Sequence, residues 1–312
     1  MKIKKISQEI LLMLLFVQLL LLLNGCSTKI GMFVHANIAP LPSYQYEFSD
    51  GYPGTYYVHQ KGNKENSDVI VFFIGGSGHT SYFYYLRQYF NELQGNTTIY
   101  ALQKRYVKKR ETGMRKASKE FDYHNYHSQI VQDQKEFIIG ILKSNDFKHK
   151  KIVLFGVSEG GNISVHLAKE IQEITHLILL GSGGMPALEE FKMWGNQYNM
   201  DFDLVYQEVK KYPENIKLRI AGQTYKYWAS ALPFKPMDYF KSLTIPILVA
   251  NGEKDEMAPV ESVYFMQNEF KKLKKENLIV KVFADCSHTL EDSDGKNHKA
   301  EFFRIASDWW NK

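Results

Sequence analysis

Residues 150–168 constrain the fold of this chain more than any other stretch. They read KKIVLFGVSEGGNISVHLA, an apolar run at 152–155, then Gly156-Val157-Ser158-Glu159-Gly160-Gly161, then apolar positions at helical spacing. A short and wholly apolar run predicts a strand that is buried on both faces, as in a parallel sheet. We therefore predict a strand, a sharp turn at Ser158 and a helix that packs against the sheet.

The glycines on either side of Ser158 fit a strained corner. A strand that turns at once into a helix forces the corner residue into a sparsely populated backbone conformation, and glycine nearby removes Cβ atoms that would clash. Gly156 and Gly160 occupy these places. The Ser158 hydroxyl is then expected to project above the sheet edge, beside the positive end of a helix.

In this strand–turn–helix context, the segment resembles the nucleophile elbow of the α/β-hydrolase superfamily. The resemblance implies an α/β-hydrolase fold, with a mostly parallel sheet, helices on both faces and Ser158 as the nucleophile. The order of predicted elements agrees, because strands alternate with helices along most of the chain. The expected strands cover residues 44–48, 54–59, 68–74, 97–102, 152–155, 176–180, 245–251 and 277–284, the first two as an antiparallel pair.

A second glycine cluster, Gly75-Gly76-Ser77-Gly78, ends the predicted strand at 68–74. Glycines let a loop approach a ligand without intervening side chains, and the resemblance implies that this loop donates one N–H to the oxyanion. By that mapping the donors are Gly76 or Ser77 together with Glu159, the residue after the nucleophile. A phosphate-binding loop is excluded because residues 79–81 complete neither glycine motif of that kind. A plain turn remains the alternative.

Two further residues follow strand ends in the order that the superfamily keeps. Asp255 comes after the predicted strand at 245–251, and His288 after the last strand. The order Ser158, Asp255, His288 is that of the superfamily, and each residue is expected at the edge of the sheet where open α/β sheets bind ligands. The resemblance implies that His288 is the general base and that Asp255 orients it. Glu253 and Glu256 are acidic neighbours that remain alternatives to Asp255.

Residues 185–241 form a connection that is far longer than ordinary loops in α/β proteins. The resemblance implies that this insertion is a helical lid over the nucleophile. It is rich in aromatic side chains, which either line a site for an acyl or aromatic group or form the small core of the lid itself. For most of them the second interpretation is favoured.

The first 25 residues have the composition of a secretory signal. Lysines at positions 2, 4 and 5 precede an apolar run at 10–23 that is short for a membrane span. The run ends in Leu23-Asn24-Gly25-Cys26, which resembles the lipobox of bacterial lipoproteins and implies cleavage before Cys26 and lipidation of that cysteine. An uncleaved signal anchor is the alternative. Ser27 resembles the sorting signal for an outer membrane, where the cell has one.

Composition limits the remaining classes of function. The formal net charge is +5 over 312 residues, and no DNA- or RNA-binding motif is present, so nucleic acid is not an expected partner. The chain has two cysteines, of which Cys26 is the expected lipid site, so Cys286 has no disulfide partner. No metal-binding histidine spacing occurs, and we expect no metal and no cofactor. Residues 104–119 carry eight basic side chains and are expected to form a solvated loop, with contact to anionic lipid or polymer as the alternative.

The predicted protein is an envelope-anchored serine hydrolase that cleaves small-molecule carboxylic esters or thioesters through an acyl-enzyme. Residues 1–25 are the signal peptide, 26–43 the lipidated cysteine and tether, and 44–312 one hydrolase domain. A peptidase or acyltransferase on the same scaffold is one alternative, and a binding lipoprotein without catalysis is another. The sequence does not predict an oligomeric state.

Overall fold

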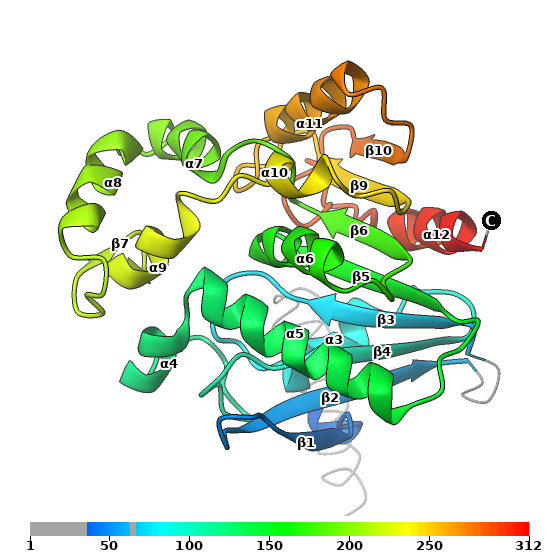
Figure 1. The fold of residues 1–312 in the computed structure, drawn as a ribbon. Helices are drawn as coiled ribbons and strands as arrows, with labels where there is room; N and C mark the ends of the chain where they lie inside the picture. The colour runs from blue at the N-terminus through cyan, green and yellow to red at the C-terminus, as the bar shows by residue number, and fades with distance from the viewer. Residues whose placement is uncertain (1–35, 63–66, 312) are drawn as a thin grey trace, which may run out of the picture.

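A computed structural model of the chain describes residues 36–62 and 67–311. In this part, strands form one eight-stranded sheet in the order β1-β2-β4-β3-β5-β6-β9-β10 (Figure 1). The pairs β1–β2 and β2–β4 are antiparallel, and the others are parallel. The strands are β1 (Ser43–Glu47), β2 (Pro53–Lys61), β3 (Val69–Ile74), β4 (Thr97–Leu102), β5 (Lys151–Val157), β6 (His176–Leu180), β9 (Ile247–Gly252) and β10 (Leu278–Phe283).

Helices cover both faces of this sheet, as the alternating sequence pattern predicts. One face packs against α5 (His127–Ser144), α6 (Glu159–Glu170), α10 (Met237–Phe240) and α11 (Val260–Lys272). The other packs against α3 (Tyr82–Tyr89) and α12 (Lys299–Trp310). All six residues of strand β3 are buried, and they alternate between the cores on the two faces of the sheet. Such a strand must be apolar throughout.

The insertion between β6 and β9 begins with α7 (Ala187–Asn196) and α8 (Phe202–Lys211). A two-stranded hairpin of β7 (Arg219–Ile220) and β8 (Gln223–Thr224) follows, then α9 (Tyr225–Ala231) and α10. Elements α7 to α9 lie beyond the carboxyl ends of the parallel strands (Figure 1). They enclose a small core of their own, as predicted for most of the aromatic side chains, with the buried residues Phe202, Val205, Val209, Tyr227, Trp228 and Leu232.

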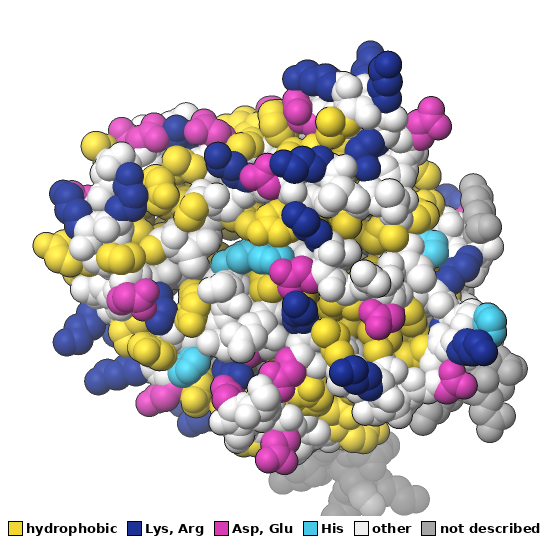
Figure 2. All heavy atoms as spheres, viewed as in Figure 1, with side chains coloured by type: hydrophobic (Ala, Val, Ile, Leu, Met, Phe, Trp, Pro, Cys, Tyr) yellow, Lys and Arg dark blue, Asp and Glu magenta, His cyan; other side chains and the backbone are white. Residues whose placement is uncertain are grey.

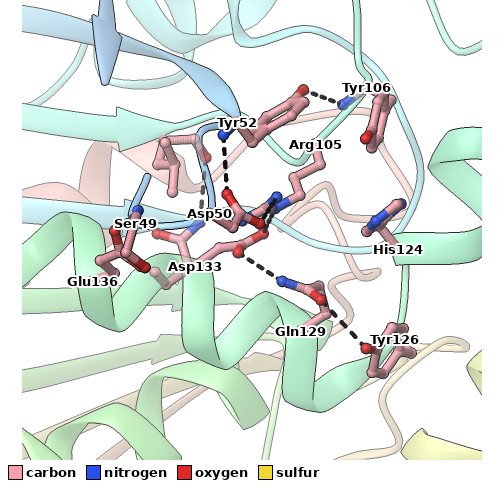
Figure 3. A network of polar contacts seen from close by, with 12 residues as sticks. Ser49, Asp50, Tyr52, Arg105, Tyr106, His124, Tyr126, Gln129, Asp133 and Glu136 are labelled. Carbon is pink, nitrogen blue, oxygen red and sulfur yellow. Dashed lines mark hydrogen bonds and ion pairs between the residues drawn. The ribbon is translucent and has the colours of Figure 1, made fainter. Parts of the chain in front are cut away.

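The segment after β4 is only partly the solvated loop that its charge predicts. Six of its eight basic residues are exposed, but Arg105 is buried and Lys104 is half-buried. The Arg105 guanidinium donates from Nη1 to Asp50 Oδ2 at 2.6 Å and from Nε to Asp133 Oδ2 at 2.8 Å (Figure 3). It also lies over the rings of Phe48 and Tyr52, 4.7 and 4.6 Å from their centroids. Arg105 thus joins the β1–β2 turn to α5.

Replacement of Arg105 by methionine is expected to lower the free energy of unfolding by about 3–5 kcal/mol, because Asp133 is then left buried without its cation. The hydrogen bond from Arg105 also lowers the pKa of the Asp50 carboxyl. Urea unfolding at pH 7 measures the effect. Lys108→Met removes an exposed cation of the same segment and is the matched control, expected to change stability by about 0.5 kcal/mol or less. Equal midpoints for the two variants would contradict the role of Arg105.

The predicted signal peptide, Cys26 and residues 27–35 of the tether lie outside the described residues. Across 36–62 and 67–311, no helix is both long and apolar enough to cross a bilayer.

Candidate active site

Ser158 stands at the corner between β5 and α6 in a strained conformation, with φ 55° and ψ −125°. Its N–H donates to the Leu180 carbonyl at 2.9 Å, which ties the corner to the end of β6. The two flanking glycines are required by close packing. A Cβ on Gly160 would lie 2.0 Å from the Ile74 carbonyl oxygen, and one on Gly156 would lie 2.3 Å from the Gly160 carbonyl oxygen. The local sequence therefore permits this turn where larger residues would prevent it.

His288 and Asp255 lie in direct contact although 33 positions separate them. His288 Nδ1 is 2.9 Å from Asp255 Oδ1 and 2.8 Å from Oδ2. The Asp255 carboxylate is buried, and its Oδ1 also accepts from the backbone N–H groups of Met257 and Ala258 at 2.9 and 2.8 Å. These donors fix the carboxylate, which in turn fixes the imidazole so that Nε2 faces away from the acid.

The other two acidic candidates make different contacts. Glu253 is exposed and accepts a hydrogen bond from the Asp285 N–H at 3.0 Å. Glu256 is exposed to solvent. Of the three acids in this loop, Asp255 is therefore the one that holds the histidine.

The end of β6 lies between Ser158 and His288. Gly181 follows Leu180, has φ +62°, and a Cβ on it would lie 2.7 Å from His288 Cε1. Gly181 and Ser158 both line the same cavity. Within the part of the chain that the structure describes, the Ser158 hydroxyl and the His288 ring form no hydrogen bond with one another. Such bonds are often long before substrate is present.

The glycine loop after β3 reaches the nucleophile. A Cβ on Gly76 would lie 3.2 Å from Ser158 Cβ and 3.7 Å from Ser158 Oγ, and Ser77 lines the cavity. The Gly75 N–H already donates to the hydroxyl of Tyr82 at 2.9 Å. Glu159 is the first residue of α6, and its N–H therefore has no acceptor within the helix.

The cavity above Ser158 has a volume of about 130 Å³ and lies between the sheet edge and the insertion. Figure 2 shows a hollow between the insertion and the rest of the molecule, with histidine side chains inside it. His127 lines the cavity, and burial lowers its pKa to about 4, so its ring is neutral at pH 7. The insertion contributes the aromatic walls, which are Phe191, Trp194, Tyr227 and Trp228.

Two carboxylates line the cavity, and they differ in how they are paired. Glu159 lies 2.5 Å from the Lys104 ammonium. Glu190, on α7, accepts through Oε2 from the Ser262 hydroxyl at 2.9 Å. Burial raises the pKa of Glu190 to about 7, with a smaller contribution from the charge of Asp255. Sequence reasoning did not single out Glu190, since no pattern separates it from its exposed neighbour Glu189.

His288 has a raised pKa as the result of opposing effects. Burial by itself lowers the pKa of this imidazole, but the hydrogen bond to Asp255 and the charge of that carboxylate outweigh it. As for metals, the residues of 36–62 and 67–311 contain no group of three or more side chains placed to hold an ion.

No protein-family model and no curated protein sequence matches this chain. Its structure is similar to that of acylaminoacyl peptidase from Pyrococcus horikoshii, with a TM-score of 0.60 and 13% identity over 89% of this chain and 43% of that one. The chain thus spans less than half the length of that peptidase. For an esterase from Pyrococcus furiosus the TM-score is 0.58 and the sequence identity is 17%, over 87% of this chain and 90% of the esterase. For an esterase from Exiguobacterium antarcticum the TM-score is 0.56 and the sequence identity is 16%, over 86% of this chain and 99% of the esterase. With the strand order and the turn at Ser158, these likenesses show that the chain has the α/β-hydrolase fold.

Proposed function

We propose that this chain is a serine hydrolase that cleaves short carboxylic esters or thioesters, with Ser158, His288 and Asp255 as its catalytic triad. One observation carries the proposal. A histidine held by a buried carboxylate lies at the same sheet edge as a serine in a strained turn, and Gly181 adjoins the histidine and lines the serine's cavity. This arrangement of base, acid and a serine that lines the cavity fits acyl transfer.

The mechanism follows from these positions. His288 Nε2 takes the proton from Ser158 as Oγ attacks the substrate carbonyl, and Asp255 stabilises the imidazolium that forms. The proposed donors to the oxyanion are the N–H of Gly76 or Ser77 and the N–H of Glu159, and the loss of one such donor typically costs about 10²–10³ in rate. His288 then gives its proton to the departing alkoxide or thiolate. Water, deprotonated by His288, attacks the acyl-enzyme and restores Ser158.

The size of the cavity favours small acyl groups. At about 130 Å³ it is close to an apolar cavity of roughly 150 Å³ that binds benzene. The insertion acts as a lid in this proposal, since its aromatic side chains close the cavity from above. An esterase is the function we put forward and a peptidase is the alternative, because both kinds of enzyme are among the similar structures.

A fluorophosphonate probe tests this function directly. The probe is expected to form a covalent bond to Ser158 Oγ with loss of fluoride, and mass spectrometry locates the modified peptide. We expect p-nitrophenyl acetate and butyrate to be cleaved faster than the palmitate ester. The corresponding p-nitroanilides, run in parallel, test the peptidase alternative, which a faster turnover of amides relative to their intrinsic reactivity would favour. Folded protein that takes no label would leave only the binding-protein alternative.

The proposed location is the bacterial cell envelope, outside the cytoplasm, with Cys26 carrying the lipid. The support is the sequence of residues 1–26, namely a charged start, an apolar run and a lipobox-like end. In cells fed a radiolabelled or alkyne-bearing fatty acid, the protein is expected to take up the label, and Cys26→Ala is expected to take up none. Label in the Cys26→Ala protein would contradict this anchor.

A further inference from the structure

One carboxylate that lines the cavity, that of Glu190, has no counter-ion among the described residues. Glu159 has Lys104 as its counter-ion, whereas no lysine, arginine or histidine of residues 36–62 and 67–311 forms an ion pair with Glu190. Its Oε2 accepts from the neutral Ser262 hydroxyl, and its Oε1 accepts no hydrogen bond from the part of the chain described. A poorly hydrated carboxylate without a counter-ion is costly, because desolvation is not repaid by attraction. Glu190 is half-buried, and a proton or a cation from outside would stabilise it.

Aromatic rings surround the same space. Phe191 follows Glu190 on α7, and its ring centroid lies 4.8 Å from that of Trp228 in an edge-to-face arrangement. Trp194, one turn further along α7, also lines the cavity, as does Tyr227. The faces of such rings carry partial negative charge and attract cations, an effect worth about 2 kcal/mol or more where water is excluded. No lysine or arginine is among the described residues that line the cavity.

We propose that Glu190 and these aromatic walls bind a positively charged group of the substrate, an ammonium that lies within a few bonds of the scissile carbonyl. The proposal rests on the proposed function, because it takes Ser158 as the group that attacks that carbonyl. A trimethylammonium group fits a cavity of about 130 Å³. The substrate class is therefore a small cationic ester or thioester rather than a fatty ester.

Two matched pairs of substrates test the proposal. The first pair is the p-nitrophenyl ester of 4-(trimethylammonio)butyrate and that of 5,5-dimethylhexanoate, which replaces the charged nitrogen by carbon. The second pair places the charge in the alcohol, with 2-(trimethylammonio)ethyl acetate and 3,3-dimethylbutyl acetate. In one of the pairs we expect kcat/KM to be at least about tenfold higher for the cation. The pair that shows the preference identifies the side of the scissile bond that Glu190 faces.

Glu190→Gln is the decisive variant, with Glu189→Gln as its matched control. Glutamine keeps the shape and the hydrogen bond from Ser262 but removes the charge, so the preference for the cation is expected to fall to about twofold or less. The readout is the ratio of kcat/KM for the cationic ester to that for its neutral isostere, measured in the variant and in the wild type. Glu189 is exposed and pairs with Lys192, and its variant should keep the full preference. A preference that survives in Glu190→Gln, or none in the wild type, overturns the proposal.

The preference is also expected to rise between pH 6 and pH 8, as Glu190 loses its proton. Among the described residues, the other titratable groups around this space are Asp255, His288, His127, Glu159 and Tyr227, with Lys104 paired to Glu159. The ratio of the two substrates cancels the ionisation of His288, because both reactions use the same base. The ratio of kcat/KM for the two substrates could instead be independent of pH and the same in Glu190→Gln as in the wild type. This result would mean that Glu190 stays protonated, and it would overturn the proposal.

Binding without catalysis separates this proposal from the function on which it rests. Trp194 and Trp228 line the cavity, so tryptophan fluorescence reports its occupation. Titration with tetramethylammonium chloride is expected to give a saturable change that sodium chloride does not give and that Glu190→Gln abolishes. If this binding occurs while no ester is cleaved, the hydrolase proposal fails and the cation site stands. If neutral esters are cleaved but no cation binds, only the cation site fails.

Discussion

Replacement of Ser158 by alanine is expected to abolish fluorophosphonate labelling and to lower ester hydrolysis by on the order of 10⁶ in kcat, the loss typical for the nucleophile of a triad. The reason is that no acyl-enzyme forms without Oγ, and His288 and Asp255 then have no proton to move. The residual rate comes from the oxyanion donors and from binding alone. Labelling with a fluorophosphonate and initial rates with p-nitrophenyl acetate measure both parts.

Ser182→Ala is the matched control for this variant. Ser182 lines the same cavity and is buried, but it stands at the end of β6 and not at the strained turn. Its variant should keep the label and most of the activity. Loss of label in Ser182→Ala with retention in Ser158→Ala would place the nucleophile elsewhere. The φ of 55° suits alanine no worse than serine, so Ser158→Ala should unfold at the same temperature as the wild type.

Asp255→Asn is expected to lower kcat by about 10⁴ without loss of the fold. Asparagine fills the same space, but it offers one acceptor oxygen and an amide donor in place of a carboxylate, so His288 is held in the wrong tautomer. The amide also lacks the negative charge that stabilises the imidazolium. Steady-state rates with p-nitrophenyl acetate, alongside circular dichroism, test both statements.

The same variant is expected to change the pH dependence. In the wild type, Asp255 holds the pKa of His288 above its ordinary value of 6.5, against the effect of burial. Only the neutral imidazole accepts a proton, so kcat/KM should fall as pH decreases through that raised pKa. Without the Asp255 carboxylate, burial lowers the pKa of His288 against only the smaller effects of the Glu256 and Glu190 charges, and the acidic limb should move to lower pH. Glu253→Gln removes the neighbouring acid that contacts the Asp285 N–H, and should leave both the rate and the limb unchanged. The reverse pattern would assign the acid to Glu253.

Those parts of the fold that depend on local sequence were predictable. The buried strands at 97–102 and 176–180 have the predicted bounds, because apolar runs between turn residues specify both type and length. Strand β9 begins two residues later than predicted. Pro246 has no N–H to donate to a ladder, so regular pairing starts at Ile247. The short helix α4 (Lys119–His124) was not predicted, because six residues carry little periodicity.

In the site, the positions of some residues could be predicted from the sequence, whereas the contacts of others could not. Ser158, Asp255 and His288 each follow the end of a strand. Parallel strands bring those ends to one edge of the sheet, so the sequence predicts that the three residues lie at that edge. The Glu190 environment depends on how α7 docks near the start of α11, where Ser262 lies. The burial of Arg105 likewise depends on Asp50 and Asp133, which are 55 and 28 positions away. Neither partner can be read from neighbouring residues.

Arg105 anchors its segment from the interior, so the exposed cations of the segment are not its main attachment to the fold. Since one buried guanidinium holds the segment between the β1–β2 turn and α5, the six outward-facing cations of 104–119 can be exchanged without unfolding the chain. Substitutions can thus change the charge of this segment to suit a different surrounding surface, while the sheet edge that carries Ser158 keeps its structure.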